Sequence, residues 1–221
     1  MPGDDFLTRL LLAAPGILIA LVFHEYAHAR VAYAFGDPTP RLQGRLTLDP
    51  RAHLDWLGVI VLLMSNFRFG WARPVQVNVY KLRPRVAGEL AVSLAGIAMN
   101  VLLAILFVVA AGLSRPLVQG PLGFNVVRMF GLAAEINLWL AIFNFLPVPP
   151  LDGWRFFRRL IPGFAGSRLA DWLDQFGMFA LMLLIVFPSG QVILRLLLQP
   201  FRWLLVGTVE GVSGFLLGLL S

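Results

Sequence analysis

Long apolar runs separated by short polar loops dominate the pattern of this chain. A helix needs about twenty apolar residues to cross a bilayer, and several runs reach or approach that length. The predicted spans ahead of the last region are residues 6–35, 86–113, 124–146 and 171–187. From Pro188 to Ser221 we expect an interfacial helix that leads into a final span from about Trp203. The pattern predicts an all-α polytopic membrane protein with about five to six transmembrane helices.

The segment between the first two spans does not fit a simple crossing. Residues 56–69 are apolar but too short to span comfortably, and arginines flank both ends. Because positive charges favour the cytoplasmic side of a membrane, both ends are expected to face the cytoplasm. The segment is therefore predicted to be re-entrant or interfacial.

Two short stretches beside this segment alternate apolar and polar residues, which is the pattern of a β-strand. They are residues 44–50 and residues 75–79, the second directly after Pro74. Backbone outside a helix survives near a membrane only where protein or a wet cavity surrounds it. The predicted short β-strands therefore indicate a sheltered, partly hydrated site, where the edge of residues 75–79 can accept an added strand.

Composition supports a membrane protein and limits its chemistry. The chain has 221 residues and is 58% hydrophobic, above the roughly 45–50% of soluble domains. It has no cysteine, which excludes disulfides and thiolate metal sites and leaves histidine and carboxylates as ligands. The net charge of +6 is distributed over the loops, as topology requires, so no nucleic-acid partner is expected. We expect one integral membrane domain over residues 1–221.

The first span carries the sequence His24-Glu25-Tyr26-Ala27-His28 in its second half. Residues four apart share a helix face, so His24 and His28 can direct a ring nitrogen at one zinc ion. Glu25 projects one step round the helix, where it can take a proton from a metal-bound water. An ionisable group inside a bilayer costs about 3 kcal/mol, and a bound metal offsets that cost. The alternative is a polar helix face that packs against another helix.

A second polar feature interrupts the end of the third span. The stretch from Asn144 to Gly153 contains three prolines, which remove backbone donors and prevent a continuous helix. Asp152 closes this unwound stretch. A carboxylate is a suitable third ligand beside two imidazoles and leaves the fourth tetrahedral position for water. The alternative is that Asp152 only caps a helix over residues 153–161.

The predicted topology brings both features to the same side of the membrane. The arginines around residues 56–69 assign those loops to the cytoplasm, so His24 and His28 lie in the cytoplasmic half of the first span. The third span returns to that side and ends beside Asp152. Two distant parts of the chain are thus expected at the same depth, as a shared metal site requires.

Together, these motifs resemble those of the site-2 protease family, the intramembrane zinc metalloproteases. The resemblance covers nearly the whole chain. Three further segments, residues 36–39, 44–50 and 70–75, resemble the compact prokaryotic branch without an appended PDZ or CBS domain. The chain departs from the family pattern at Ile97, where a proline is common.

The resemblance implies that one Zn²⁺ ion is held by His24, His28 and Asp152, with Glu25 as the catalytic acid and base. It also implies that Asn144 is a polar group at the active site, where it can donate a hydrogen bond to the developing oxyanion. An equally good alternative is that Asn144 only caps its helix.

The activity implied by the resemblance is hydrolysis of a peptide bond in or near the transmembrane segment of a membrane-protein substrate, as in regulated intramembrane proteolysis. A single membrane protease domain would carry it out in the prokaryotic plasma membrane, with the active site toward the cytoplasm. The expected partners are the transmembrane substrate and the lipid bilayer. The oligomeric state stays open.

Two non-proteolytic functions compete with this interpretation. A metal transporter should carry repeated ligands along a path through the membrane, whereas the candidate ligands here form one cluster. An inactive homologue that only binds transmembrane helices would have no need for Glu25.

Other polar residues have less specific expectations. We expect His53 to form a structural hydrogen bond to the re-entrant segment in preference to a zinc role. Asn100, at the depth of Asn137, is expected to form an interhelical hydrogen bond in preference to a substrate contact. Glu135 and Glu210 lie in apolar surroundings but belong to no chain of titratable groups, which disfavours a proton relay.

Overall fold

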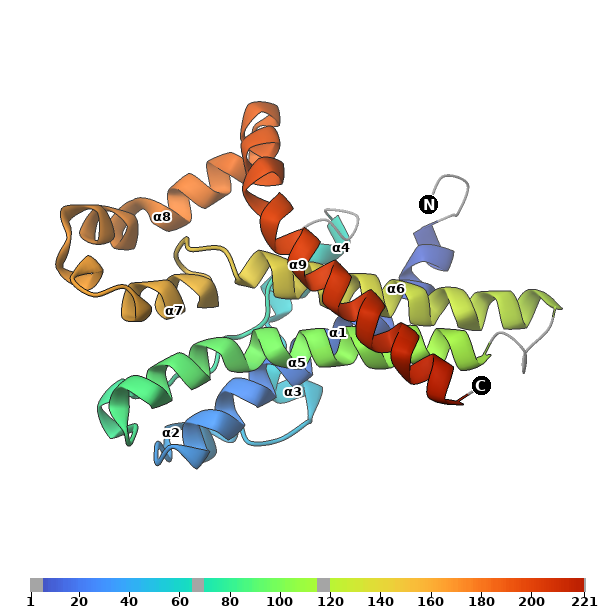
Figure 1. Cartoon of the computed structure of the whole chain (residues 1–221), viewed down its shortest axis with the longest axis horizontal. Coiled ribbons are helices and arrows are strands. Elements are labelled where there is room, and N and C mark those ends of the chain that lie inside the picture. Colours follow the sequence, from blue (N-terminus) through green and yellow to red (C-terminus); the bar gives the residue numbers. More distant parts are fainter. Residues whose placement is uncertain (1–5, 65–69, 115–119, 221) are drawn as a thin grey trace.

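The fold is almost entirely helical, as the apolar pattern predicts. The computed structural model describes residues 6–64, 70–114 and 120–220. Its elements are α1 (Phe6–Ala34), α2 (Thr39–Leu42), α3 (Pro50–His53), α4 (Trp56–Met64), η1 (Val79–Lys81), α5 (Arg85–Ser114), α6 (Gly120–Asn144), α7 (Asp152–Leu160), η2 (Phe164–Gly166), α8 (Arg168–Val186) and α9 (Pro188–Leu220). Figure 1 labels the α-helices.

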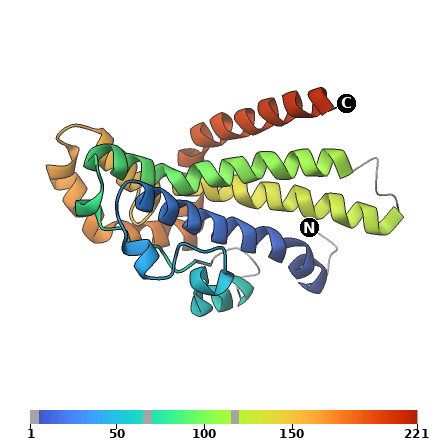
Figure 2. The ribbon, with the colours of Figure 1, turned by 90° about the horizontal axis from the view of Figure 1, so that it is seen from below.

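Three long helices, α1, α5 and α6, run side by side at the centre of the fold (Figure 1 and Figure 2). Figure 2 shows α9 along α5, on the side that faces away from α1, and Figure 1 shows α7 and α8 together at one end. Because α5 contacts α1, α6, α7 and α9, it is the helix on which the other elements assemble.

Small residues allow the central helices to approach closely. Gly16 of α1 lies against Ala133 of α6, where an added Cβ would come within 2.8 Å of the Ala133 Cα. Ala20, Ala29 and Ala104 are completely buried. The close approach leaves little space between the helices, so polar side chains that point inward have to meet one another.

Within the described residues, four helices are long and apolar enough to cross a membrane: α1, α5, α8 and the Leu122–Asn144 part of α6. They coincide with the four spans predicted ahead of Pro188. The predicted total of about five to six is not confirmed, because the last predicted span falls in α9, where many side chains lie outside the described residues. α9 is also one helix that contains Pro200, instead of an interfacial helix followed by a separate span.

Neither predicted β-strand forms in the described part of the chain. Residues 44–50 turn at Gly44, which has a φ of 67°, and then enter α3. In residues 75–79, the N–H groups of Val75 and Asn78 donate to the side chains of Glu25 and Asp37. An alternation of apolar and polar residues predicts which side chains face a core, but a β-strand also needs a second strand that accepts its backbone N–H groups. Here the carboxylates of Glu25 and Asp37 accept those N–H groups instead.

The two ends of the predicted re-entrant segment lie together. Leu54 and Ala72 form an antiparallel bridge, and the Arg73 N–H donates to the His53 carbonyl at 2.8 Å. α4 forms the first part of the segment, and residues 65–69 lie outside the described residues. Ends that meet fit a segment that enters and leaves on one side of the membrane.

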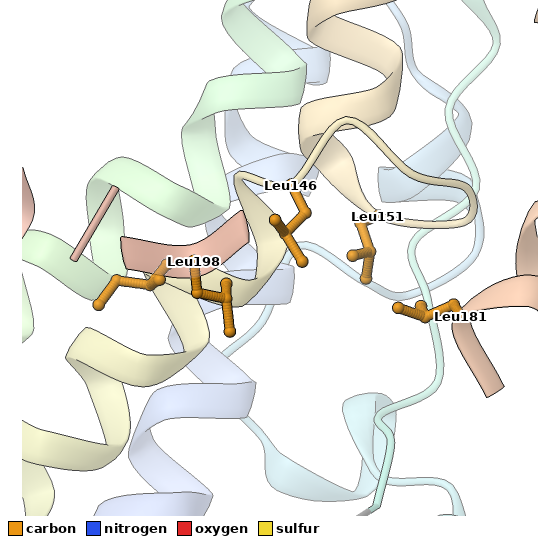
Figure 3. Packing of buried hydrophobic residues seen from close by; sticks show 5 residues of the cluster. Leu146, Leu151, Leu181 and Leu198 are labelled. Carbon is orange, nitrogen blue, oxygen red and sulfur yellow. The ribbon is translucent and has the colours of Figure 1, made fainter. Parts of the chain in front are cut away.

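A small apolar core holds the proline-rich connection between α6 and α7 (Figure 3). Leu146 and Leu151 belong to this connection and pack with Ile142 of α6, Leu181 of α8 and Leu198 of α9. None of the five is more than 9% exposed. The connection is therefore fixed by three helices and leads into α7 at a defined place.

Candidate metal centre

Three potential metal ligands meet where α1 contacts the start of α7. The Nε2 atoms of His24 and His28 are 3.1 Å apart, and Asp152 Oδ2 lies 3.1 Å from the first and 3.0 Å from the second. Both histidines are buried. The structure thus brings the three predicted ligands together, although 124 residues separate His28 from Asp152.

The other ring nitrogen of each histidine is held by α5. Nδ1 of His24 lies 2.6 Å from Asn100 Oδ1, and Nδ1 of His28 lies 2.8 Å from the Val92 carbonyl oxygen. Both partners are acceptors, so both Nδ1 atoms carry a proton and donate it. Each imidazole is therefore fixed as the tautomer with a free Nε2 lone pair, which is the form that binds a metal.

The cluster has the donors and the spacing that a metal requires. Two Nε2 lone pairs and a carboxylate oxygen face one another, and a cation between them would remove their mutual repulsion. Around a tetrahedral zinc with bonds of about 2.0–2.1 Å, ligand atoms are about 3.3 Å apart, close to the 3.0 to 3.1 Å found here. Among the residues described, no other group of three histidines or carboxylates could hold a metal.

Asn100 of α5 orients His24 through a buried network. Its Nδ2 donates to the Ala20 carbonyl at 3.3 Å and to Asn137 Oδ1 at 2.9 Å, and Asn137 in turn donates to the Ala133 carbonyl at 2.8 Å. Because a carbonyl oxygen can only accept, Asn100 has to direct its own Oδ1 at His24. The predicted interhelical hydrogen bond of Asn100 is confirmed, and its partners are Asn137 and the candidate metal ligand His24.

Gly96 of α5 lies directly against both imidazoles. A Cβ at this position would lie 2.4 Å from His24 Cε1 and 2.5 Å from His28 Nε2, distances that no relaxation of a packed ring can accommodate. Only glycine therefore leaves room for the rings. Ile97, the departure from the family pattern, is buried within α5, and the helix continues through it.

Asp152 is presented by the first turn of α7. The following Gly153 packs so closely on the preceding backbone that an added Cβ would lie 2.3 Å from a carbonyl oxygen. Trp154 Nε1 donates to Asp174 Oδ1 of α8 at 2.8 Å, and Arg158 Nη1 lies 2.8 Å from Oδ2 of the same residue. These contacts fix α7 against α8.

The carboxylate of Asp152 is directed at the histidines. Its Oδ2 lies 3.1 Å from His24 Nε2 and 3.0 Å from His28 Nε2. The N-cap residue of α7 is Leu151, which makes no side-chain cap bond. A role as helix cap alone therefore does not account for Asp152.

Glu25 lies on α1 beside the cluster and is 9% exposed. Its Oε2 accepts the N–H of Val75 at 2.8 Å, which leaves Oε1 outside that bond. The loop that carries Val75 is held farther along by Asp37, whose Oδ2 accepts the N–H of Asn78 at 2.7 Å. The predicted acid and base is thus positioned by a loop.

Asn144 is not joined to the metal ligands by a hydrogen bond in the described part of the chain. It is the last residue of α6, and its Nδ2 donates to the Leu140 carbonyl at 3.0 Å. Its role at an active site stays a prediction.

The remaining polar candidates lie outside the cluster. His53 is completely buried, and its Nε2 lies 2.7 Å from the carbonyl oxygen of Thr47, which precedes α3 and is not part of the predicted re-entrant segment. Glu135 is exposed on α6. The side chain of Glu210 lies outside the described residues.

Sequence reasoning missed three contributions from α5. Val92 supplies a carbonyl to His28, Gly96 supplies space, and Asn100 supplies an acceptor to His24. A signal was available in their spacing, because residues 92, 96 and 100 are four apart and so lie on one face of a helix.

Comparisons with known proteins complete the description. The family model described as "Peptidase family M50" matches residues 118–187. A Bacillus subtilis protein named "Putative zinc metalloprotease YwhC" is 38% identical over 209 residues, which cover 90% of this chain and 93% of that protein. "Putative zinc metalloprotease Rip2" of Mycobacterium tuberculosis is 30% identical over 182 residues, 81% of this chain and 68% of that protein. No solved structure is significantly similar.

Proposed function

The chain belongs to peptidase family M50, the site-2 proteases, and we propose that it cleaves a peptide bond in or near the transmembrane segment of a membrane-protein substrate. It is a zinc metalloprotease with Zn²⁺ as its cofactor, and its apolar helices are those of a membrane protein. The proposed process is regulated intramembrane proteolysis, in which such a cut releases a membrane-tethered protein.

The observation that most directly supports this proposal is the meeting of His24, His28 and Asp152 inside a bundle of apolar helices. Both histidines lie within α1, which is a candidate span. A substrate that already resides in the bilayer can reach such a site by lateral movement, whereas a soluble protein would have to insert between apolar helices. A membrane-embedded substrate therefore fits the site best.

In the proposed mechanism, His24, His28 and Asp152 hold the zinc ion. When bound there, zinc acts as a Lewis acid that lowers the pKa of water toward about 7 and polarises the scissile carbonyl. Glu25 takes the proton of the attacking water on Oε1 and delivers it to the leaving amine. The Val75 N–H, which donates to Oε2, keeps the Glu25 carboxylate in position through both transfers.

A helical substrate hides its amide groups, so cleavage requires a locally extended backbone. Residues 74–78 belong to no helix, and Val75 joins them to Glu25. Within the described chain, the N–H groups of Gln76 and Val77 donate to no protein acceptor. We infer that an unwound substrate pairs with this segment. Asn144, with one amide proton not used by Leu140, is the proposed donor to the developing oxyanion.

The proposed location is the prokaryotic plasma membrane, with the active site toward the cytoplasm. Arginines gather near the end of the bundle that carries Asp152, including Arg45 and Arg73 in loops and Arg158 in α7. Loops of this charge favour the cytoplasmic side.

The test is cleavage of a single-span substrate by the purified full-length protein in proteoliposomes, with the ends of the fragments located by mass spectrometry. The zinc-loaded protein is expected to cut within or next to the span. Glu25→Gln should bind the same amount of zinc while its cleavage rate falls by about 10²–10⁴-fold. Glu135→Gln is the matched control, because it makes the same change at an exposed carboxylate on α6.

Undiminished cleavage by Glu25→Gln would remove that residue from the mechanism. Zinc bound in full, with no fragment from any single-span substrate, would refute intramembrane proteolysis while leaving the metal site intact.

A further inference from the structure

A polar cavity of about 370 Å³ opens between the loop after α2 and the segment before η1. Its walls are formed by Gln43, Arg45, Arg73, Pro74 and Gln76. The Gln43 Nε2 donates to Gln76 Oε1 at 2.9 Å and so joins the two walls. Neither the predicted zinc site nor the proposed proton transfers use this cavity.

The cavity is positively charged and contains no carboxylate. Arg45 is 5% exposed, and its Nη1 donates to the carbonyl oxygens of Ala52 and Arg73. No ion pair joins Arg45 or Arg73 to a carboxylate among the described residues. Two arginines therefore line one cavity, and neither is in an ion pair with a carboxylate of the described chain.

This arrangement is unfavourable for the protein alone. Burial lowers the pKa of Arg45, the charge of Arg73 lowers it further, and the charge of Glu25 opposes both effects. Guanidinium groups have only donors and match the planar geometry of a carboxylate. An anion in the cavity would accept their free N–H groups and neutralise the repulsion between them.

The cavity adjoins the active site through a shared segment. Pro74 lines the cavity, and the next residue, Val75, donates its N–H to Glu25. Gln76, on the other side of Val75, lines the cavity again. Any polypeptide that pairs with this segment and reaches Glu25 has to pass the two arginines within a few residues of the cleaved bond.

We propose that the cavity between Arg45 and Arg73 is a substrate subsite that binds the carboxylate of an aspartate or glutamate side chain close to the cleaved bond. The inference rests on the proposed function and extends it to a substrate preference. A substrate carboxylate is favoured over a lipid phosphate because the cavity shares its wall with the segment that positions Glu25. A substrate that lies at the active site would therefore bring its own carboxylate to the cavity.

The experiment uses the zinc-loaded full chain in proteoliposomes made of phosphatidylcholine alone or with phosphatidylglycerol. A single glutamate is moved through successive positions on both sides of the cleaved bond of a single-span substrate, and each version is compared with glutamine at the same position. The wild-type protein should prefer glutamate by about tenfold in kcat/KM, mainly through KM, at one or two adjacent positions. The preference should be the same in both lipids.

The variants separate the subsite from general attraction by a basic surface. Arg73→Gln removes an exposed side chain and should abolish the preference. Arg73→Glu should reverse it, so that lysine at the same position becomes the better residue. Arg51→Gln is the matched control, because Arg51 is an exposed arginine of α3 that does not line the cavity, and it should keep the full preference.

A second arm measures binding without cleavage. The Glu25→Gln protein is titrated with fluorescent peptides that carry glutamate or glutamine at the preferred position, and the glutamate peptide should bind about tenfold more tightly. If no substrate is cleaved but this difference is found and Arg73→Gln abolishes it, the proposed function fails and the subsite stands.

Three results would overturn the subsite. The first is equal use of glutamate and glutamine at every position. The second is a preference of similar size at all positions, which would mean long-range attraction. The third is a cleavage rate that depends on phosphatidylglycerol and not on the substrate glutamate. If Arg73→Gln abolishes that dependence, the cavity binds a lipid headgroup.

Discussion

Replacing Asn100 by alanine should weaken zinc binding although no zinc ligand is removed. The substitution deletes the acceptor that lies 2.6 Å from His24 Nδ1 and fixes both the tautomer and the orientation of the ring. Loss of such a partner of a metal-binding histidine typically lowers metal affinity 10–100-fold. That range corresponds to about 1.4–2.7 kcal/mol.

The upper part of this range is expected because the site is dry and closely packed. Asn100 is completely buried, so the His24 N–H would face a small space without another acceptor, at a cost of about 1–3 kcal/mol for an unsatisfied buried group. Truncation also leaves Asn137 Oδ1 without its donor at 2.9 Å. We therefore expect an affinity loss near 100-fold together with a less stable bundle.

Two further variants separate the effect on zinc from the effect on packing. Asn137→Ala breaks the network one step farther from the metal and leaves the Asn100 oxygen beside His24, so it should destabilise the bundle but keep zinc affinity within about threefold. Asn100→Asp keeps an acceptor for His24 and should retain zinc, while it loses the two bonds that Asn100 Nδ2 makes.

Zinc affinity is measured by competition with a chromophoric chelator on the purified full-length protein, and helix content by circular dichroism. An Asn100→Ala protein with wild-type helix content and an affinity within twofold of the wild type would refute the reasoning. Equal losses in Asn100→Ala and Asn137→Ala would assign the effect to packing instead of to His24.

Three further changes test other parts of the site. Gly96→Ala should abolish stoichiometric zinc binding, measured by elemental analysis, because its Cβ would lie 2.4 Å from an imidazole carbon. Gly131→Ala is the control and should bind zinc normally, because its Cβ would meet open space. Val75→Pro removes the N–H that holds Glu25 and should lower kcat about tenfold with unchanged zinc content, whereas Val75→Ala should not. Leu151→Ala should lower the free energy of unfolding by about 2–4 kcal/mol, seen as an earlier thermal transition, and a shift below about 1 kcal/mol would mean that the connection is not held by its core.

The long helices could be predicted because bilayer thickness sets the length of an apolar run. The first span was expected over residues 6–35, and α1 covers Phe6–Ala34. The candidate ligands could be predicted as well, because the four-residue spacing of His24 and His28 fixes their common face within a single helix. Asp152 could be predicted as a ligand because three prolines end the third span just before it. Unwound backbone at that depth has to line a polar site.

The rest of the site depends on contacts between helices that are far apart in sequence. That Asn100 would meet His24, rather than only Asn137, follows from the packing of α5 on α1 and not from any local pattern. The predicted strands failed for a related reason, because the donors of residues 75–79 are taken by Glu25 and Asp37, and no local alternation reveals such partners. The cavity at Arg45 likewise arises only when two separate loops meet.

Each part of the metal centre is held by a different kind of interaction, and this division follows from where the parts lie. Within the bundle, small residues bring the helices close, so His24 and His28 can be oriented only by groups already on α5, namely a carbonyl and an amide. Asp152 comes from a connection outside the bundle, where an apolar core and the Trp154–Asp174 bond supply the rigidity that helix packing cannot. Glu25, the proposed acid and base, is held through Oε2 by a loop N–H, which leaves Oε1 outside that bond. The two imidazoles and the carboxylate are thus fixed by independent supports, and a bound zinc ion would join α1 to α7 through them.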